Sequence, residues 1–132
     1  MSTVVLLTHP ASAQAALAWA VQFATEHRHH LHVVVTGADT PGAPSYVSPR
    51  VLAELDQALV ASGLAFTAHV ESRDPAAKAV ALTEEHQADV LVVGIRRRSV
   101  TAKFLLGSAA QRVSRDADCP VVLVKGEHLS GP

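Results

Sequence analysis

The chain has 132 residues, of which 48% are hydrophobic but only 4% aromatic, and its formal net charge is -1. This length suffices for one well-buried domain, so we expect residues 1–132 to fold as a single domain around valine, leucine and alanine side chains. The near-zero charge gives no general attraction to nucleic acid or anionic lipid, and no apolar run approaches the ~20 residues of a membrane span, so we expect neither partner. No signal peptide is visible and a single cysteine, Cys119, excludes an intrachain disulfide, which together favour the cytoplasm.

Short apolar runs alternate with segments of helical spacing along the chain. The runs are rich in valine, which is typical of strands buried on both faces. The segments between them repeat apolar residues on one helical face. This pattern predicts strands at residues 3–7, 31–36, 64–70, 90–93 and 121–124, and helices at residues 12–26, 49–62, 75–87 and from about 108 onward.

Capping residues mark the ends of the expected helices. Ser12 is a suitable N-cap for the first helix, and Asp74 followed by Pro75 is a cap-plus-proline signal for the third. Gly63 stands where a helix-ending C′ glycine is expected. The glycine- and proline-rich residues 37–48 predict a mobile loop that closes over a ligand.

Five strands alternating with four helices predict an α/β fold, with an open five-stranded parallel sheet covered by helices on both faces. Residues 64–70 alternate apolar and polar side chains, so this strand is expected at a half-exposed edge of the sheet. In such sheets, ligands bind beyond the carboxyl ends of the strands, at the point where the strand order reverses.

Residues 90–108 carry the strongest signal of a binding site. Four apolar residues are followed by Gly94, which we expect to end the strand, then by three arginines at 96–98, and finally by Gly-Ser at 107–108. Free backbone N–H groups at a helix N-terminus favour anions, and glycine lets a phosphate approach the backbone closely. The alternative is a solvated basic loop, and the segment matches neither a Walker loop nor the dinucleotide-binding fingerprint.

The chain resembles the universal stress protein family along almost its whole length, most clearly at residues 92–94, 107–113 and 117–124. Nucleotide-binding members of that family carry Gly, two residues, Gly, nine residues, and then Gly-Ser or Gly-Thr. Gly94, Gly107 and Ser108 match the outer parts of this motif with the full spacing, whereas Arg97 replaces the middle glycine. The resemblance implies a Rossmann-like fold, similar to adenine nucleotide alpha hydrolases, with strand order 3-2-1-4-5.

The resemblance also implies a site for ATP or AMP in the crevice between the first and fourth strands. Members that bind ATP usually have Asp-Gly-Ser after the first strand, where this chain has Thr8, His9 and Pro10. The threonine hydroxyl can make a hydrogen bond but cannot do the work of a carboxylate identically. The implied contact residues, none of them catalytic, are Thr8, His9, Thr36, Val93, Gly94, Arg96, Arg97, Gly107, Ser108 and Ala109.

Three of these residues also have alternative interpretations. Gly94 can simply end a strand, and Ser108 can act only as a helix N-cap. Arg97 can grip phosphate oxygens in a bidentate manner, or its long side chain can fill the pocket and exclude a nucleotide.

The histidines and the cysteine have mainly structural interpretations. His27, His29, His30 and His32 resemble a metal cluster, but they straddle a helix end and a strand start with no carboxylate or cysteine fixed beside them. We therefore expect no metal site. Cys119 is interpreted as a buried structural residue.

These observations leave three functional hypotheses. The first is a regulatory domain of the universal stress type that binds ATP or AMP without efficient turnover. The second is a dimeric stress-response interaction protein that has lost nucleotide binding through Arg97 and Thr8. The third, a phosphoryl-transfer enzyme, is disfavoured because no carboxylate follows the first or fourth strand to hold Mg²⁺. The first hypothesis is favoured.

The last expected strand suggests how the chain assembles. It is apolar throughout and lies at a sheet edge, and unprotected edges of this kind are usually covered. The resemblance implies a twofold homodimer that pairs these strands, through Val121, Val122, Leu123 and Val124.

Overall fold

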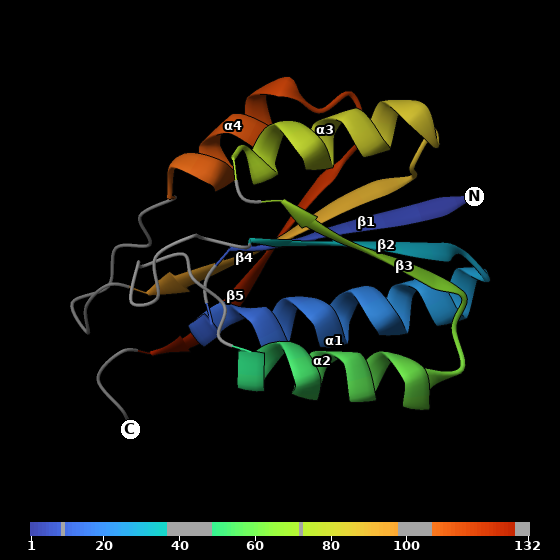
Figure 1. Ribbon diagram of the computed structural model, residues 1–132. Coiled ribbons are helices and arrows are strands. Elements are labelled where there is room, and N and C mark those ends of the chain that lie inside the picture. The colour runs from blue at the N-terminus through green and yellow to red at the C-terminus, as the bar shows by residue number, and fades with distance from the viewer. Residues whose placement is uncertain (9, 37–48, 72, 98–106, 129–132) are drawn as a thin grey trace.

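A computed structural model describes residues 1–8, 10–36, 49–71, 73–97 and 107–128. Strands and helices alternate from the N-terminus to the C-terminus in this part of the chain (Figure 1). They are β1 (Ser2–Leu7), α1 (Pro10–His27), β2 (His30–Thr36), α2 (Pro49–Ser62), β3 (Phe66–Glu71), α3 (Pro75–Glu85), β4 (Val90–Arg97), α4 (Ser108–Asp116) and β5 (Val121–His128).

The described strands form one parallel sheet with the order β3-β2-β1-β4-β5, so the predicted fold class and strand order are confirmed. Helices α1 and α2 cover one face of the sheet and α3 and α4 cover the other (Figure 1). Strand β3 lies at one edge, as its alternating sequence predicted, and β5 lies at the other. The order reverses between β1 and β4, which places the ligand-binding crevice of such folds at the carboxyl ends of these two strands.

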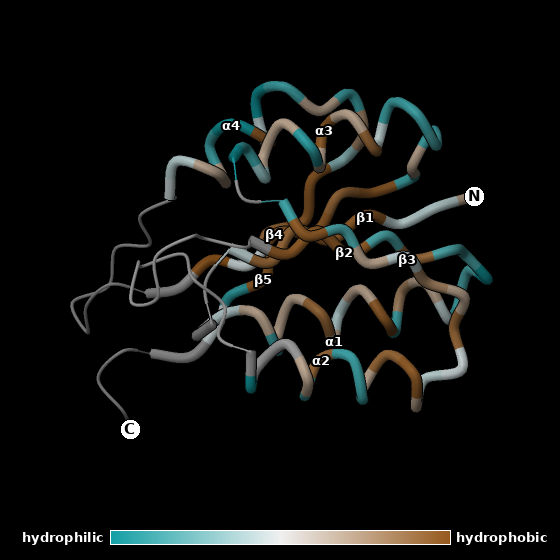
Figure 2. Tube along the Cα trace, in the orientation of Figure 1, coloured by the Kyte–Doolittle hydropathy of each residue, from teal (hydrophilic) through white to brown (hydrophobic). Residues whose placement is uncertain are grey.

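Strand β1 is buried along its whole length because helices cover both of its faces. Val5 and Leu7 pack towards α1 and α2, whereas Val4 and Leu6 pack towards α3 and α4. Burial of each such side chain stabilises the fold by roughly 1.5–3 kcal/mol. Figure 2 shows the most hydrophobic residues concentrated along the central strands, between the two helical layers.

Two of the predicted caps are confirmed. Asp74 is the N-cap of α3, and its Oδ1 accepts a hydrogen bond from the backbone N–H of Ala77 at 3.1 Å. Gly63, directly after α2, has a φ of 74°, a left-handed conformation that glycine adopts without the penalty of a Cβ atom.

Three predicted boundaries are wrong. Helix α1 begins at Pro10, and Ser12 lies inside its first turn rather than at the N-cap, because proline is pre-organised for the first helical position. Gly94 does not end β4: the strand continues to Arg97, because β5 continues beside it. Strand β5 itself extends to His128, past its four apolar residues. Backbone pairing thus carries both strands beyond their hydrophobic runs.

Candidate functional site

The candidate site lies at the carboxyl ends of β1 and β4, where the strand order reverses. Thr8 follows β1 directly and is half-buried, and α1 begins two residues later at Pro10. Thr36 ends β2, the neighbour of β1, so the carboxyl ends of β2, β1 and β4 lie side by side at this edge of the sheet.

Gly94 is required by the packing of α1 against β4. A Cβ atom on this residue would lie 2.8 Å from both the Cβ and the Oγ of Ser12 and 2.9 Å from the Ser12 carbonyl oxygen. Contacts this short are not tolerated, so no side chain fits here without movement of the first turn of α1. Gly94 therefore brings the start of α1 close to the strand that leads into the candidate site.

Gly107 has no such packing role. Among the described residues, no atom lies within 4 Å of a Cβ atom placed at this position, and the φ of -66° and ψ of 167° are open to any residue. Gly107 is the N-cap of α4, which places Ser108 at the first helical position rather than at the cap. Both residues are exposed. No residue in the described part of the chain therefore crowds the N-terminus of α4 at this glycine.

The start of α4 has the features of an anion site. Gly107 has no side chain, so this N-cap residue cannot accept a hydrogen bond from the first backbone N–H groups of the helix as a serine or aspartate would. These N–H groups and the helix dipole favour a negatively charged ligand. Ala109 follows on the inner side of this turn, where it packs against the core and fixes the helix end.

The remaining predicted site residues are described only in part. Val93 is fully buried among the core residues beneath α3 and α4, and its strand is paired on both sides, with Leu6 on β1 and Leu123 on β5 as its partners. The backbones of Arg96 and Arg97 form the end of β4, and Arg97 is paired with His128 across a register irregularity. The positions of the arginine and Thr36 side chains, His9, and the expected loop at 37–48 lie outside the described residues.

Arg112 on α4 has a structural partner. Its Nη1 donates a hydrogen bond to Asp74 Oδ1 at 2.7 Å, so this ion pair joins the second turn of α4 to the N-cap of α3. The N–H of Ala77 and the Arg112 guanidinium together hold the pKa of Asp74 below its usual value. Sequence reasoning missed this pair, because residues 74 and 112 lie on separate helices and only the tertiary fold brings them together.

Comparison with known proteins identifies the family. The universal stress protein family profile matches residues 1–125. The chain belongs to the universal stress protein family. A universal stress protein of Methanocaldococcus jannaschii is 41% identical over 51 residues, a match that covers 39% of this chain and 30% of that relative.

Solved universal stress proteins share the fold along nearly the whole chain. The structure of one from Archaeoglobus fulgidus matches with a TM-score of 0.73 and 27% identity, over 95% of this chain and 98% of that one. A universal stress protein crystallised in complex with cAMP matches with a TM-score of 0.66 and 27% identity, over 96% of this chain and 98% of that one.

The four histidines at 27–32 that resembled a metal cluster fall into two pairs in this universal stress protein, His27 with His29 and His30 with His32. His27 stacks on Phe23 with ring centroids 4.0 Å apart, and His29 contacts Thr3 and Asp89 at 2.9 and 3.0 Å. Burial lowers the pKa of His29, against the raising effect of Asp89. His30 contacts Thr67 on β3 instead. Among the described residues, no group of three histidine, cysteine or acidic side chains is placed to hold a metal ion.

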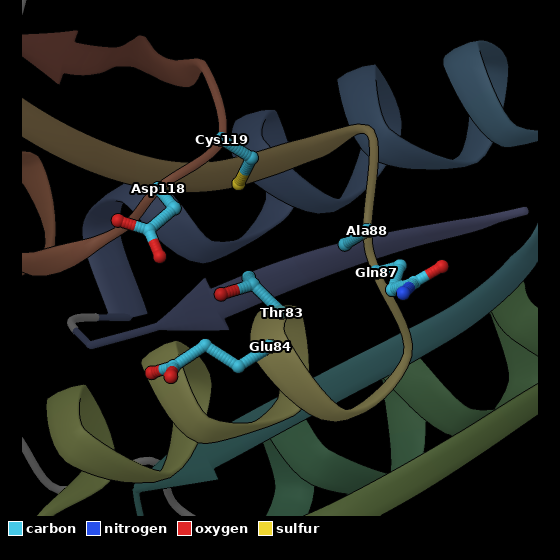
Figure 3. Close-up of a pocket in the computed structure, with 6 residues that line it drawn as sticks. All are labelled: Thr83, Glu84, Gln87, Ala88, Asp118 and Cys119. Carbon is cyan, nitrogen blue, oxygen red and sulfur yellow. The ribbon is translucent and has the colours of Figure 1, made fainter.

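A shallow pocket of about 360 Å³ lies at the opposite end of the sheet, beside the amino ends of β4 and β5 (Figure 3). Its lining comprises Thr83, Glu84, Gln87, Ala88, Asp118 and Cys119. The lining includes two carboxylates and no basic residue, which disfavours a phosphate ligand. Cys119, interpreted as a buried structural residue, is partly buried, and desolvation raises the pKa of its thiol, which lowers its reactivity.

Proposed function

We propose that this universal stress protein binds an adenine nucleotide, ATP or AMP, at the carboxyl ends of β1 and β4 as a regulatory ligand, in the cytoplasm and without efficient turnover. The observation that carries the proposal is the start of α4, where the N-cap residue is the exposed Gly107, which offers no capping side chain and which no described residue crowds. A phosphate group satisfies such N–H groups and is favoured by the helix dipole.

The relative crystallised with cAMP supports an adenine nucleotide as the ligand class. It is 27% identical over nearly the full length of both chains. We assign the phosphates to Gly107, Ser108 and the backbone of Ala109, with Arg96 and Arg97 as candidate cationic partners, since guanidinium groups bind phosphate oxygens in a bidentate manner.

The nucleoside half of the site is assigned to the ends of β1 and β2. Thr8 offers a hydroxyl group that can donate and accept hydrogen bonds, in place of the carboxylate of ATP-binding relatives. His9 and Thr36 are the neighbouring candidates for contact with the ribose and the base. Val93 lies in the core within a strand that is paired on both sides, so we assign it no direct contact with the ligand. Gly94 acts indirectly, by holding the start of α1 close to β4.

A regulatory role fits better than phosphoryl transfer. Residues 8–11 and 95–107, which follow β1 and β4, contain no aspartate or glutamate. Phosphoryl transfer requires a group to hold Mg²⁺ and one to orient the nucleophile, and carboxylates commonly provide both. We therefore propose that bound nucleotide changes the stability or the partners of the chain rather than being consumed.

A charge placed at the start of α4 tests the proposal. Ser108→Asp puts a carboxylate at the first helical position, where it suits the helix dipole but repels a phosphate. At a ligand concentration of 100 Kd, binding stabilises the fold by about 2.7 kcal/mol, which raises the Tm by on the order of 10 °C in a domain of this size. We expect ATP, AMP or cAMP at millimolar concentration to raise the Tm of the unaltered protein but not that of Ser108→Asp.

The matched control is Ser114→Asp, which adds the same charge to an exposed position near the other end of α4. This variant should keep the ligand-induced increase in Tm. If neither the unaltered protein nor Ser114→Asp responds to any of the three nucleotides, the alternative of an interaction protein without nucleotide binding is favoured. That alternative is motivated by Arg97 and Thr8, which replace the motif glycine and aspartate of nucleotide-binding relatives.

A further inference from the structure

Four histidines that are far apart in the sequence meet on the face of the sheet that α3 and α4 cover. His30 and His32 lie on β2 with the same orientation, because side chains alternate between the faces of a strand. His69 lies on the neighbouring edge strand β3, and His86 is the C-cap of α3. We call these four residues the histidine cluster.

The contacts within the histidine cluster are direct. His32 Nδ1 and His69 Nε2 are 3.3 Å apart, within hydrogen-bond distance. The His86 ring stacks on that of His32 with centroids 4.1 Å apart and an interplanar angle of 22°, and the His30 and His32 rings are 4.7 Å apart. His32 is thus the centre of the cluster, and its side chain joins β2, β3 and the end of α3.

This geometry limits how many protons the cluster can hold. A hydrogen bond between two ring nitrogens needs a lone pair on one of them, so at least one of His32 and His69 is neutral in the folded state. If both rings are fully protonated, two N–H groups face each other and the contact becomes repulsive. The His86 ring also stacks directly on the His32 ring, so a positive charge on both rings at once is repulsive.

The surroundings add to this effect. His32 is only 5% exposed, and its neighbour on β1 is the fully buried Val4. Burial, with smaller contributions from His86, His30 and His69, lowers the pKa of His32 to about 4. The folded structure therefore favours the neutral form of His32 at neutral pH.

The charged groups that act on His69 from α3 are Lys78 and Glu85. Burial, Lys78, His86 and His30 lower the pKa of His69, and only Glu85 opposes them. Glu85 also lies 3.9 Å from His86. On β3 itself, the Glu71 carboxylate accepts hydrogen bonds from the backbone N–H groups of Arg73 and Asp74, just before α3. Glu85 is thus the carboxylate that opposes the lowering of the His69 pKa, and it also lies near His86.

We propose that the histidine cluster is a proton-sensitive contact that holds edge strand β3 and the C-terminal end of α3 against β2 at neutral pH and releases them when two or more of its members become protonated. Such a device couples the acidity of the surroundings to the stability of one edge of the sheet. The unfolded chain binds these protons at ordinary histidine pKa values, so acidification favours the opened form.

The sign and size of the effect follow from the lowered pKa values. A histidine whose pKa is lowered by folding adds stability above its unfolded value of 6.5, and this contribution is lost as the pH falls towards its folded value. For His32 alone, the unfolding equilibrium constant should increase about 20-fold between pH 7 and pH 5. Chemical denaturation at both pH values, with EDTA present so that metal ions do not contribute, measures this change.

The variant His32→Gln/His69→Gln removes both protonation sites and keeps polar groups in place. Its unfolding constant should change much less between pH 7 and pH 5 than that of the unaltered protein. His29, whose pKa is also lowered, is present in both proteins, so its contribution cancels. His27→Gln, at an exposed position on α1, is the control and should keep the part of the pH dependence that the histidine cluster contributes, although His27 also lowers the pKa of His29 slightly. An undiminished pH dependence in the double variant would overturn the proposal.

Two measurements on the unaltered protein keep the test decisive if the double variant fails to fold. NMR titration of the histidine ring protons should show at least one member of the histidine cluster with a midpoint far below 6.5. Hydrogen exchange, corrected for the intrinsic rate at each pH, should show β3 losing protection at pH 5 before β1 and β4 do. Four independent midpoints near 6.5, or uniform loss of protection across the sheet, would contradict the proposal.

Discussion

The first turn of α1 leaves no room for a side chain on residue 94: a Cβ atom there would lie 2.8 Å from the Cβ atom of Ser12. Ser12 is itself only 1% exposed, so it cannot turn away into solvent. The glycine that begins the family motif is therefore a packing residue in this structure. Its effect on a ligand is indirect, through the position of the helix that starts beside the candidate site.

This contact predicts that Gly94 tolerates an added side chain less well than Gly107 does. Gly94→Ala should reduce the free energy of unfolding by about 1–3 kcal/mol, as is typical of an overpacked core. Ser12→Gly should restore only part of this loss, because the Ser12 carbonyl oxygen stays 2.9 Å from the added Cβ atom. Urea denaturation measures both changes.

Gly107→Ala is the control for that experiment. The added Cβ atom meets nothing, so the cost should be no more than the ~1 kcal/mol that distinguishes alanine from glycine at an N-cap. The interpretation of Gly94 as a packing residue would be wrong if both alanine variants were equally stable. It would also be wrong if Gly94→Ala lost ligand binding with no change in stability.

A second prediction concerns the ion pair between Asp74 and Arg112. The lowered pKa of Asp74 means that its charged form is favoured by folding. This contribution is present above the unfolded pKa of 3.8 and is lost as the pH falls through the lower folded value. Asp74→Ala should therefore destabilise the protein more at pH 7 than at pH 3, and Asp74→Asn should destabilise it less than Asp74→Ala, because asparagine is also a good N-cap.

Arg112→Gln separates the ion pair from the cap. It removes the charge partner on α4 and leaves the bond between Asp74 and the N–H of Ala77 in place. A double-mutant cycle with Asp74→Asn, measured by urea denaturation at pH 7, should give a favourable coupling that weakens with added salt. A coupling of zero would show that the 2.7 Å contact adds nothing to stability.

Sequence patterns predicted the fold better than the site, for a physical reason. Alternation of valine-rich runs with helical segments fixes an α/β fold because both depend on local side-chain periodicity. The contact of Ser12 with Gly94 and the meeting of His32 with His69 depend on how distant elements pack. Alternation did place His30 and His32 on one face of a strand, but nothing local showed that β3 and α3 would bring further histidines there.

A third prediction concerns assembly. Strand β5 lies at an edge of the sheet and carries the partly exposed Leu123, which is 37% exposed. We expect a homodimer that pairs β5 with its symmetry copy through Val121, Val122, Leu123 and Val124. Leu123→Lys should give a monomer, because it places a charge in the paired edge while Val122 and Val124 keep their packing on the core.

Light scattering at tens of micromolar protein measures the mass of both forms. Val60→Lys is the control, since Val60 is 65% exposed on α2, away from β5, and should leave the mass unchanged. A monomeric mass for the unaltered protein would rule out the dimer, and an unchanged dimeric mass for Leu123→Lys would place the interface elsewhere.

The last prediction decides whether Arg97 promotes or prevents nucleotide binding. Arg97 ends β4 at the candidate site and occupies the place of the middle glycine in the family motif. If its guanidinium binds phosphate, Arg97→Ala should weaken ATP binding by about 1.5–3 kcal/mol, the range for a hydrogen bond to a charged group. If its side chain fills the pocket, Arg97→Gly should instead create or strengthen binding.

We expect the first outcome, with affinity that falls as salt rises because exposed charges are screened within ~8 Å at physiological ionic strength. Thermal shifts with ATP, ADP and AMP measure both variants, and a shift that appears only in Arg97→Gly would favour the interaction protein over the nucleotide-binding one.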